Sequence, residues 1–222
     1  MSTPVLTGNA YDKYRSRNPI ERRLMKGFFA ALRDSLPREQ PQTVLEVGVG
    51  EGEVSARLRS LYPDAKIVGV DLHDEVLAAR WRTRDFAGVY ADIAALPFPP
   101  QAFDLVMVVE VLEHVPEPPA ALAELVRVSR GRLVLSVPRE PIWRVANVAR
   151  GKYLADLGNT PGHIQHWSRR GFAALVASQL EVLSVSTPFP WTMIGARSRP
   201  APRNGSAPAA PLGPTASGVA LR

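Results

Sequence analysis

Short apolar runs alternate with amphipathic segments along most of the chain. Runs rich in valine, leucine and isoleucine predict strands at residues 43–47, 66–70, 89–91, 103–109, 132–137, 182–186 and 192–196. Apolar residues between them recur at helical spacing, as in Val54, Leu58 and Leu61, and further helices are predicted at residues 74–81, 118–128, 142–154 and 168–179. This strict alternation predicts an α/β fold in which a parallel sheet carries helices on both faces.

The last two predicted strands are joined by only four residues, 187–190. A parallel crossover needs a dozen or more residues, so these two strands must be antiparallel. We therefore predict that residues 41–197 form a seven-stranded sheet, mostly parallel with an antiparallel last strand. The segment after it, residues 198–222, contains five prolines and no apolar periodicity, and is predicted to be a disordered Pro/Ala-rich tail.

Composition and charge narrow the classes of function. The chain has no cysteine, so it offers no disulfide, no cysteine-ligated metal and no thiol nucleophile. No basic stretch followed by an apolar run opens the sequence, and no apolar run is long enough to cross a bilayer, so a cytoplasmic protein is expected. The net charge of +6 is uneven, because residues 41–138 carry −5 while residues 1–40 and 139–170 carry +4 each. Such asymmetry indicates either a surface that meets anionic partners or scattered solvated arginines.

The first predicted strand runs directly into a glycine-rich turn, EVGVGEG at residues 46–52. The dinucleotide fingerprint Gly-x-Gly-x-x-Gly fails here, because Glu53 stands at its last position, and no Gly-Lys-Ser/Thr ending of a phosphate-binding loop follows. Glu46, Glu51 and Glu53 surround the turn with negative charge, which is unfavourable for a pyrophosphate. A ligand with a cationic end and no phosphate fits better, and S-adenosylmethionine is such a ligand. Asp71, which ends the second strand, is placed to accept hydrogen bonds from ribose hydroxyls.

Four segments in this order resemble the motifs of class I S-adenosylmethionine-dependent methyltransferases of the type 11 or 12 kind. They are residues 44–52, 68–71, 91–98 and 103–116. The resemblance implies a Rossmann-like, doubly wound sheet, S-adenosylmethionine as the cofactor, and residues 1–40 as a helical N-terminal cap. The cofactor-binding residues that it implies are Glu46, Gly48, Gly50, Gly52, Asp71, Leu72, Asp92, Ile93 and Glu110.

The resemblance also implies how some of these residues act. Asp92 is expected to bind the adenine amino group, with Leu72 and Ile93 as apolar neighbours of the adenine. The segment that begins at Glu110 is expected to lie along the methionine part of the cofactor. From the residues alone, a second reading of Asp71 stays open, in which its carboxylate caps the following helix.

Methyl transfer from a sulfonium needs a base only where the acceptor must lose a proton. The candidate catalytic residues are His114, His163 and His166. His114 lies in residues 110–116, which resemble the corresponding segment of ubiquinone-pathway O-methyltransferases. In many class I enzymes this segment only packs, so both a catalytic and a packing role are open for His114.

His163 and His166 are three residues apart and follow a glycine turn. Such a pair can ligate a metal, but no third ligand stands at a suitable spacing, so no metal is predicted. Ser168 is expected to cap the next helix, with Trp167 as its hydrophobic staple.

The expected function is transfer of a methyl group to a small-molecule acceptor, with a hydroxyl of a quinone-, lipid- or specialised-metabolite-like molecule as the leading choice. Arg144, Arg150 and Lys152 are expected to meet the N-terminal cap at the mouth of the site and to receive an anionic or membrane-lying acceptor. Nucleic acid is not expected as a substrate, because no base-methylation motif and no RNA-binding domain accompany the site. The alternatives are a non-catalytic S-adenosylmethionine-binding partner or regulatory protein, and an NAD-dependent oxidoreductase.

Overall fold

The computed structural model of the protein describes residues 17–151 and 153–199. The predicted tail at residues 198–222 lies outside this part of the chain, except for its first two residues, and so do the first sixteen residues of the predicted cap. The elements in chain order are α1 (Pro19–Ser35), β1 (Thr43–Val47), α2 (Glu53–Leu61), β2 (Lys66–Asp71), α3 (Glu75–Trp81), β3 (Ala87–Tyr90), β4 (Phe103–Val109), η1 (Leu112–His114), α4 (Pro118–Val128), β5 (Ser129–Pro138), α5 (Ile142–Ala149), η2 (Leu154–Asp156), α6 (Arg169–Gln179), β6 (Leu180–Ser186) and β7 (Trp191–Ser198).

The sheet confirms the predicted Rossmann-like, doubly wound architecture. Its seven strands lie in the order β3-β2-β1-β4-β5-β7-β6, and β1 to β5 pair in parallel. The last strand, β7, is antiparallel to both of its neighbours, β5 and β6. The tight connection after β6 turns the chain back, and β7 then inserts between β6 and β5 instead of lying at the sheet edge.

Two predicted boundaries differ from the structure in an instructive way. The helix predicted at residues 142–154 ends at Ala149, because Gly151 and Tyr153 adopt left-handed backbone conformations with φ of 69° and 52°. The fifth strand, predicted from residue 132, begins at Ser129. Its first three residues, Ser129 to Gly131, carry no apolar side chain, and Arg130 is exposed, so the hydrophobic pattern alone gave no sign of them.

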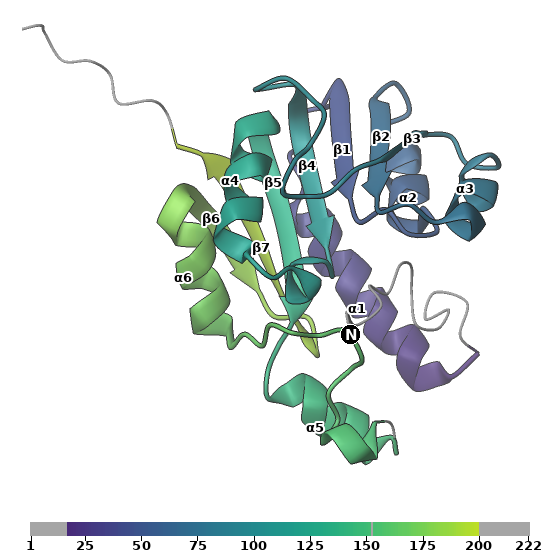
Figure 1. Cartoon of the computed structure of the whole chain (residues 1–222), viewed down its shortest axis with the longest axis vertical. Coiled ribbons are helices and arrows are strands. Elements are labelled where there is room, and N and C mark those ends of the chain that lie inside the picture. Colours follow the sequence, from purple (N-terminus) through teal and green to yellow (C-terminus); the bar gives the residue numbers. More distant parts are fainter. Residues whose placement is uncertain (1–16, 152, 200–222) are drawn as a thin grey trace, which may run out of the picture.

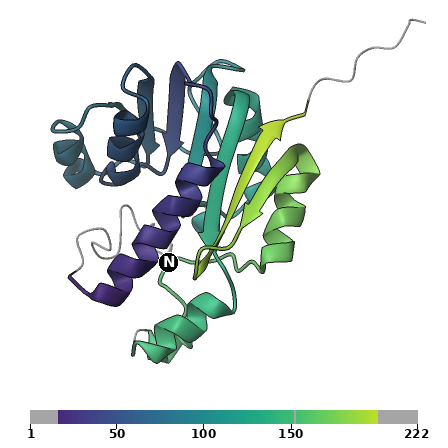
Figure 2. The same cartoon turned by 180° about the vertical axis from the view of Figure 1, so that it is seen from behind.

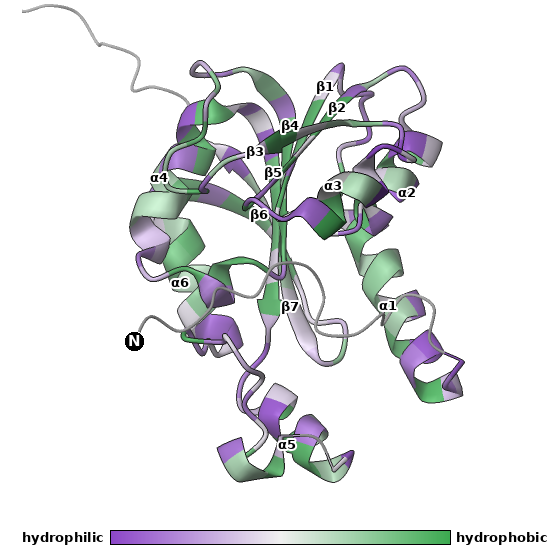
Figure 3. Cartoon of the chain, turned by 45° about the vertical axis from the view of Figure 1, so that its right-hand side comes forward, coloured by the Kyte–Doolittle hydropathy of each residue, from purple (hydrophilic) through white to green (hydrophobic). Residues whose placement is uncertain are grey.

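Helices cover both faces of the sheet, as Figures 1 and 2 show from opposite sides and Figure 3 shows nearly edge-on. Helices α4 and α6 cover one face, where Leu125 and Phe172 join a core cluster with Val106 of β4. Helices α1 and α2 cover the other face, where Phe28 and Leu58 belong to a second cluster. Helix α5 lies beyond the end of the sheet (Figure 1). Within the described residues, no helix is long and apolar enough to cross a bilayer.

Helix α1 packs against the sheet and extends past its end to line a cavity. The Asn18 side chain caps it by accepting a hydrogen bond from Ile20 N at 2.9 Å. Farther along, Phe28 is buried against Trp191 of β7, with ring centroids 5.0 Å apart. The first turn, including Glu21, extends past the sheet to a cavity beside α5.

The start of α6 confirms the predicted cap and staple. Ser168 Oγ accepts a hydrogen bond from Gly171 N at 3.1 Å, and the Trp167 ring lies 5.6 Å from that of Phe172. These contacts fix the point at which the long segment after β5 returns to the sheet.

Replacing Ser168 by alanine removes this cap and is expected to lower the free energy of unfolding by about 1 kcal/mol. Urea denaturation of both proteins measures the difference. Ser178→Ala is the matched control, because the Ser178 hydroxyl bonds only a carbonyl of its own helix, at 2.7 Å, and lies on the exposed surface. Equal losses in the two variants would contradict the capping role.

Candidate active site

Two cavities meet beyond the carboxyl ends of the central strands β1 and β4. In sheets of this type, ligands bind where the strand order reverses, between such strands. The first cavity has a volume of about 340 Å³ and the second about 650 Å³. Glu110 and His114 line both of them. The arrangement can therefore hold two ligands whose reacting ends meet at these two residues.

The first cavity collects most of the predicted cofactor-binding residues. Those that line it are Glu46, Gly48, Gly50, Asp71, Leu72, Asp92, Ile93 and Glu110. Gly52 is not among the lining residues. It occupies the N-cap position of α2 with φ of 77°, and a Cβ on it would stand 2.6 Å from the Phe86 ring. Its backbone conformation determines the shape of the turn, although Gly52 itself does not line the cavity.

The turn after β1 needs glycine at Gly48 for two reasons. Its φ is 75°, which side chains adopt rarely. A Cβ would also stand 2.1 Å from Cγ2 of Val111. Only a bare backbone lets the segments after β1 and β4 approach this closely.

The Asp71 carboxylate holds the same turn against the end of β2 by hydrogen bonds. One oxygen accepts a hydrogen bond from Gly50 N at 2.7 Å and the other from Leu72 N at 2.9 Å. Burial raises the pKa of Asp71, although these two backbone donors act in the opposite direction. The alternative reading, Asp71 as a helix cap, is wrong, because Asp74 Oδ1 accepts from Val76 N at 2.8 Å and caps α3 instead.

Glu46 is the most strongly perturbed carboxyl group of the site. It is 2% exposed, and this burial raises its pKa to about 8, against the opposing hydrogen bond from Ser55. The nearby Asp71 carboxylate raises the pKa further. A cationic group bound in the cavity would favour the ionised form of Glu46.

The floor of the first cavity is formed by Asp92 and Ile93, after β3. Asp92 Oδ1 accepts from Ala94 N at 2.9 Å, which fixes the turn, and Ile93 is 8% exposed. Leu72, which also lines the cavity, is 36% exposed. These residues give the cavity a polar group beside apolar side chains.

Glu110 stands in a strained position between the cavities. Its φ is 58°, an uncommon value for a residue with a side chain. Its carboxylate accepts hydrogen bonds from Trp191 Nε1 at 2.6 Å and from Ser136 Oγ at 3.2 Å. Charge-assisted bonds of this kind hold the carboxylate in place at the junction. Trp191 comes from β7, and nothing near it in the sequence pointed to this contact.

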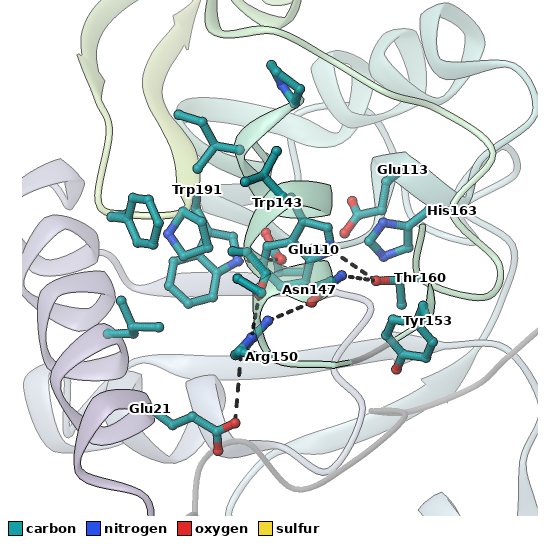
Figure 4. Close-up of a pocket in the computed structure, with 18 of the residues that line it drawn as sticks. Glu21, Glu110, Glu113, Trp143, Asn147, Arg150, Tyr153, Thr160, His163 and Trp191 are labelled. Carbon is teal, nitrogen blue, oxygen red and sulfur yellow. Dashed lines mark hydrogen bonds and ion pairs between the residues drawn. The ribbon is translucent and has the colours of Figure 1, made fainter. Parts of the chain in front are cut away.

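The second cavity is mostly apolar and aromatic (Figure 4). The first turns of α1, the segment 141–163 and the connection before β7 contribute most of its wall. The Trp143 and Trp191 rings lie 5.8 Å apart in it, and Trp143 Nε1 donates to Thr160 Oγ1 at 2.9 Å. Such a wall suits a flat, apolar ligand.

The structure brings together two of the three predicted catalytic histidines. The His114 and His163 ring centroids are 4.8 Å apart, and the rings are nearly perpendicular. His163 is 8% exposed and lines the second cavity. His166 is exposed, lines neither cavity, and its Nε2 lies 2.8 Å from Asn159 Oδ1. His166 therefore does not share the junction.

Of the basic residues that were expected at the mouth of the site, only some reach the second cavity. Arg150 lines it, with Nη2 donating to Asn147 Oδ1 at 2.6 Å and Nη1 lying 3.9 Å from the Glu21 carboxylate. Arg144 does not line the cavity and donates to Leu157 O at 3.1 Å. Residue 152 lies outside the described residues. Because a carboxylate opposes the charge of Arg150, this arginine attracts an anionic acceptor only weakly.

The seven-stranded sheet has the fold of solved S-adenosylmethionine-dependent methyltransferases, the class that the sequence resembles. Residues 45–135 match a family described as a methyltransferase domain. A solved S-adenosylmethionine-dependent methyltransferase from Aquifex aeolicus shares the fold, with a TM-score of 0.65 at 18% identity, over 82% of this chain and 94% of that chain.

Curated relatives are also similar to part of the chain. Demethylmenaquinone methyltransferase from Thermus thermophilus is 35% identical over 109 residues, which are 46% of this chain and 50% of the relative. Trans-aconitate 2-methyltransferase from Azoarcus sp. is 33% identical over 136 residues, which are 57% of this chain and 53% of the relative. The chain thus spans about half the length of the curated relatives it matches.

The matched segment contains the whole lining of the first cavity, which runs from Glu46 to Pro116. Most residues that line the second cavity lie outside it, on α1, α5 and the connection before β7. The first cavity therefore lies in the part of the chain that matches the methyltransferase domain model, and most of the second cavity lies outside that match.

Gly48→Ala is expected to weaken S-adenosylmethionine binding by at least about tenfold, because the added Cβ forces Val111 or the turn to move. Isothermal titration calorimetry measures the affinity. Gly151→Ala is the matched control: its φ of 69° imposes similar strain, but a Cβ there meets nothing within 4 Å. Equal losses in both variants would show that strain, and not the contact with Val111, is responsible.

The buried Glu46 is expected to make stability depend on pH. Its pKa is about 8 in the folded chain against 4.5 for the ordinary side chain, so the folded state keeps a proton that the unfolded state has lost. The free energy of unfolding should therefore fall as the pH rises between these two values, by an amount on the order of a few kcal/mol.

Urea denaturation of the ligand-free protein across this pH range tests the expectation, with Glu46→Gln as the comparison. The variant cannot ionise at this position and should lose that part of the pH dependence. Parallel profiles for the two proteins would contradict it.

Proposed function

We propose that the protein transfers a methyl group from S-adenosylmethionine to a hydroxyl group of a small, largely apolar, ring-containing acceptor. The observation that carries the proposal is the meeting of two unlike cavities at Glu110 and His114. Within the described part of the chain, one cavity is lined by six carboxyl groups, those of Glu46, Glu51, Glu53, Asp71, Asp92 and Glu110, and the other is mostly apolar and aromatic. Methyl transfer needs such a junction, because the donor and the acceptor must meet in line with water excluded.

The residues of the first cavity fit S-adenosylmethionine, which supplies a methyl group carried on a sulfonium. The Asp71 carboxylate would accept hydrogen bonds from the ribose hydroxyls, and Asp92 would bind the adenine amino group, with Leu72 and Ile93 beside the ring. Glu46 and Glu110 would face the cationic end of the cofactor. The carboxylates around the turn disfavour the pyrophosphate of NAD.

The second cavity supports an apolar acceptor. Its volume of about 650 Å³ suits a molecule of several rings or a ring with a short chain. Trp143 and Trp191 provide flat faces for such a ring. Among the described residues, the lining holds three carboxylates, Glu21, Glu110 and Glu113, and one arginine, Arg150, and so favours an uncharged acceptor over the anionic one considered from the sequence.

The junction also carries the groups that can assist removal of a hydroxyl proton. His114 and His163 stand there, while His166 lies apart on Asn159. We therefore retain the first two as catalytic candidates and assign His166 a local role in its loop.

Binding and turnover separate this proposal from its alternatives. Calorimetric titration with S-adenosylmethionine and S-adenosylhomocysteine is expected to show micromolar binding that Asp71→Ala abolishes and NAD does not compete with. Transfer of a labelled methyl group to a panel of phenols and hydroxyquinones then tests catalysis. Binding without transfer to any acceptor would support a regulatory protein, and competition by NAD would support an oxidoreductase.

Filling the second cavity is expected to separate acceptor use from cofactor binding. Ala146→Phe places a ring in that cavity and should lower kcat/KM for an accepted phenol by at least about tenfold, with unchanged affinity for S-adenosylmethionine. Val148→Phe is the matched control, since Val148 lies on the same helix, is 44% exposed and lines neither cavity. Equal effects in both variants would place the acceptor elsewhere.

A further inference from the structure

Three metal-ligating side chains come together at the junction. Glu113, His114 and His163 place one carboxylate oxygen and two imidazole nitrogens within 4.8 Å of one another. Glu113 is 1% exposed and His163 is 8% exposed, and Figure 4 shows the Glu113 carboxylate beside the His163 ring. The sequence gave no third ligand for the pair His163 and His166. The structure separates this pair, and the partners of His163 lie far away in the chain, on η1.

The orientation of His114 suits a metal ligand. Its Nδ1 lies 2.8 Å from the carbonyl oxygen of Gly162. A carbonyl can only accept, so Nδ1 carries a proton, and in the neutral ring Nε2 is then the nitrogen that can bind a metal. Histidines that bind metals characteristically donate their other ring nitrogen to a carbonyl or a carboxylate in this way.

The backbone holds the two segments of the cluster together. Ile164 N and Gln165 N both donate to the carbonyl oxygen of Glu113, at 2.9 and 3.0 Å. The Gln165 side chain donates to Val115 O at 3.2 Å. On its other side, the His163 ring lies nearly parallel to that of Trp143, at 24° and 6.1 Å. The ligand atoms are therefore positioned by bonds outside the cluster, as a preformed site requires.

Charge and access also favour a cation. Glu110 and Glu113 both line the acceptor cavity, and Arg150, the one arginine in the described part of its lining, faces Glu21 at 3.9 Å. Negative charge in a half-enclosed cavity attracts a cation more strongly than it would in water. All three members of the cluster face this cavity, so an ion bound to them would keep coordination positions open toward the acceptor, as catalytic metal sites do.

We propose that Glu113, His114 and His163 bind a divalent first-row transition-metal ion, and that the open side of this ion receives the acceptor's hydroxyl oxygen. Two imidazoles and one carboxylate suit Mn²⁺, Fe²⁺, Co²⁺ or Zn²⁺, whereas Mg²⁺ and Ca²⁺ favour oxygen ligands. The binding of the ion is independent of the proposed function, and its role in catalysis rests on that function.

The role follows from the chemistry of methyl transfer to oxygen. With the ion bound, His114 and His163 act as its ligands and not as bases. The O–H bond of the acceptor then breaks before methyl transfer, and its proton passes to solvent water at the mouth of the cavity. The oxygen electron pair forms the new bond to the methyl carbon, while the sulfur keeps the electrons of the broken C–S bond and becomes a neutral thioether. A cation beside the oxygen stabilises the charge left by the departing proton. No redox change is involved, so a redox-inactive ion such as Zn²⁺ serves equally well.

The test measures ion binding directly. Metal ions are first removed from the full-length protein with a chelator. The protein is then titrated with MnCl₂, and electron paramagnetic resonance measures the free Mn²⁺, whose sharp signal is lost when the ion binds. Zn²⁺ is then titrated by calorimetry. We expect one ion per chain, with affinity reduced by at least about tenfold in Glu113→Gln and in His163→Ala. His166→Ala, three residues away and outside the cluster, should bind like the unmodified protein.

Affinity for S-adenosylmethionine is measured on every variant as a check of folding that needs no acceptor. If Glu113→Gln also loses cofactor affinity, its loss of ion binding could come from misfolding. The test then depends on the comparison of His163→Ala with His166→Ala, since His163 lies in a loop. Absence of stoichiometric ion binding in a protein that binds the cofactor would overturn the proposal. Equal ion affinity in His163→Ala and His166→Ala would overturn it too, because the ion would then bind elsewhere.

Discussion

The pairing of β1 with β4 is the constraint on which both cavities depend. The two strands lie side by side at the centre of the sheet, with Val47 opposite Val108, so the chain segments that follow them begin at neighbouring points. Those segments then approach until a Cβ on Gly48 would overlap Val111. The first segment provides the turn of the cofactor cavity, and the second carries Glu110 and His114 to the boundary with the acceptor cavity.

Polar groups buried near this boundary are held by partners from distant elements. Glu110 bonds Ser136 of β5 and Trp191 of β7, so its carboxylate depends on the antiparallel hairpin being in register with the parallel sheet. The same Trp191 packs on Phe28 of α1. Helix α1, the hairpin and the junction are therefore mechanically linked, and a shift in any one of them would move the carboxylate.

The two sides of the site differ in how they are built. The cofactor cavity is lined by turns at the ends of buried strands, which the sheet fixes rigidly. The acceptor cavity is lined largely by α5 and the irregular segment after it, which lie beyond the sheet (Figure 1). Asn147 ties these parts together by donating to Gly158 O at 2.9 Å. A rigid donor side and a separately built acceptor side allow one fold to serve many acceptors.

The sequence by itself determined the layered fold, the antiparallel hairpin and most of the residues that line the first cavity. Strand periodicity is a local property, and the residues that follow parallel strands necessarily meet at one sheet edge. Only the tertiary structure separated His163 from His166, joined His163 to Glu113 and His114, and brought Trp191 to Glu110. These contacts depend on the path of the long connection after β5 and on strand order, and neither leaves a periodic signal in the sequence.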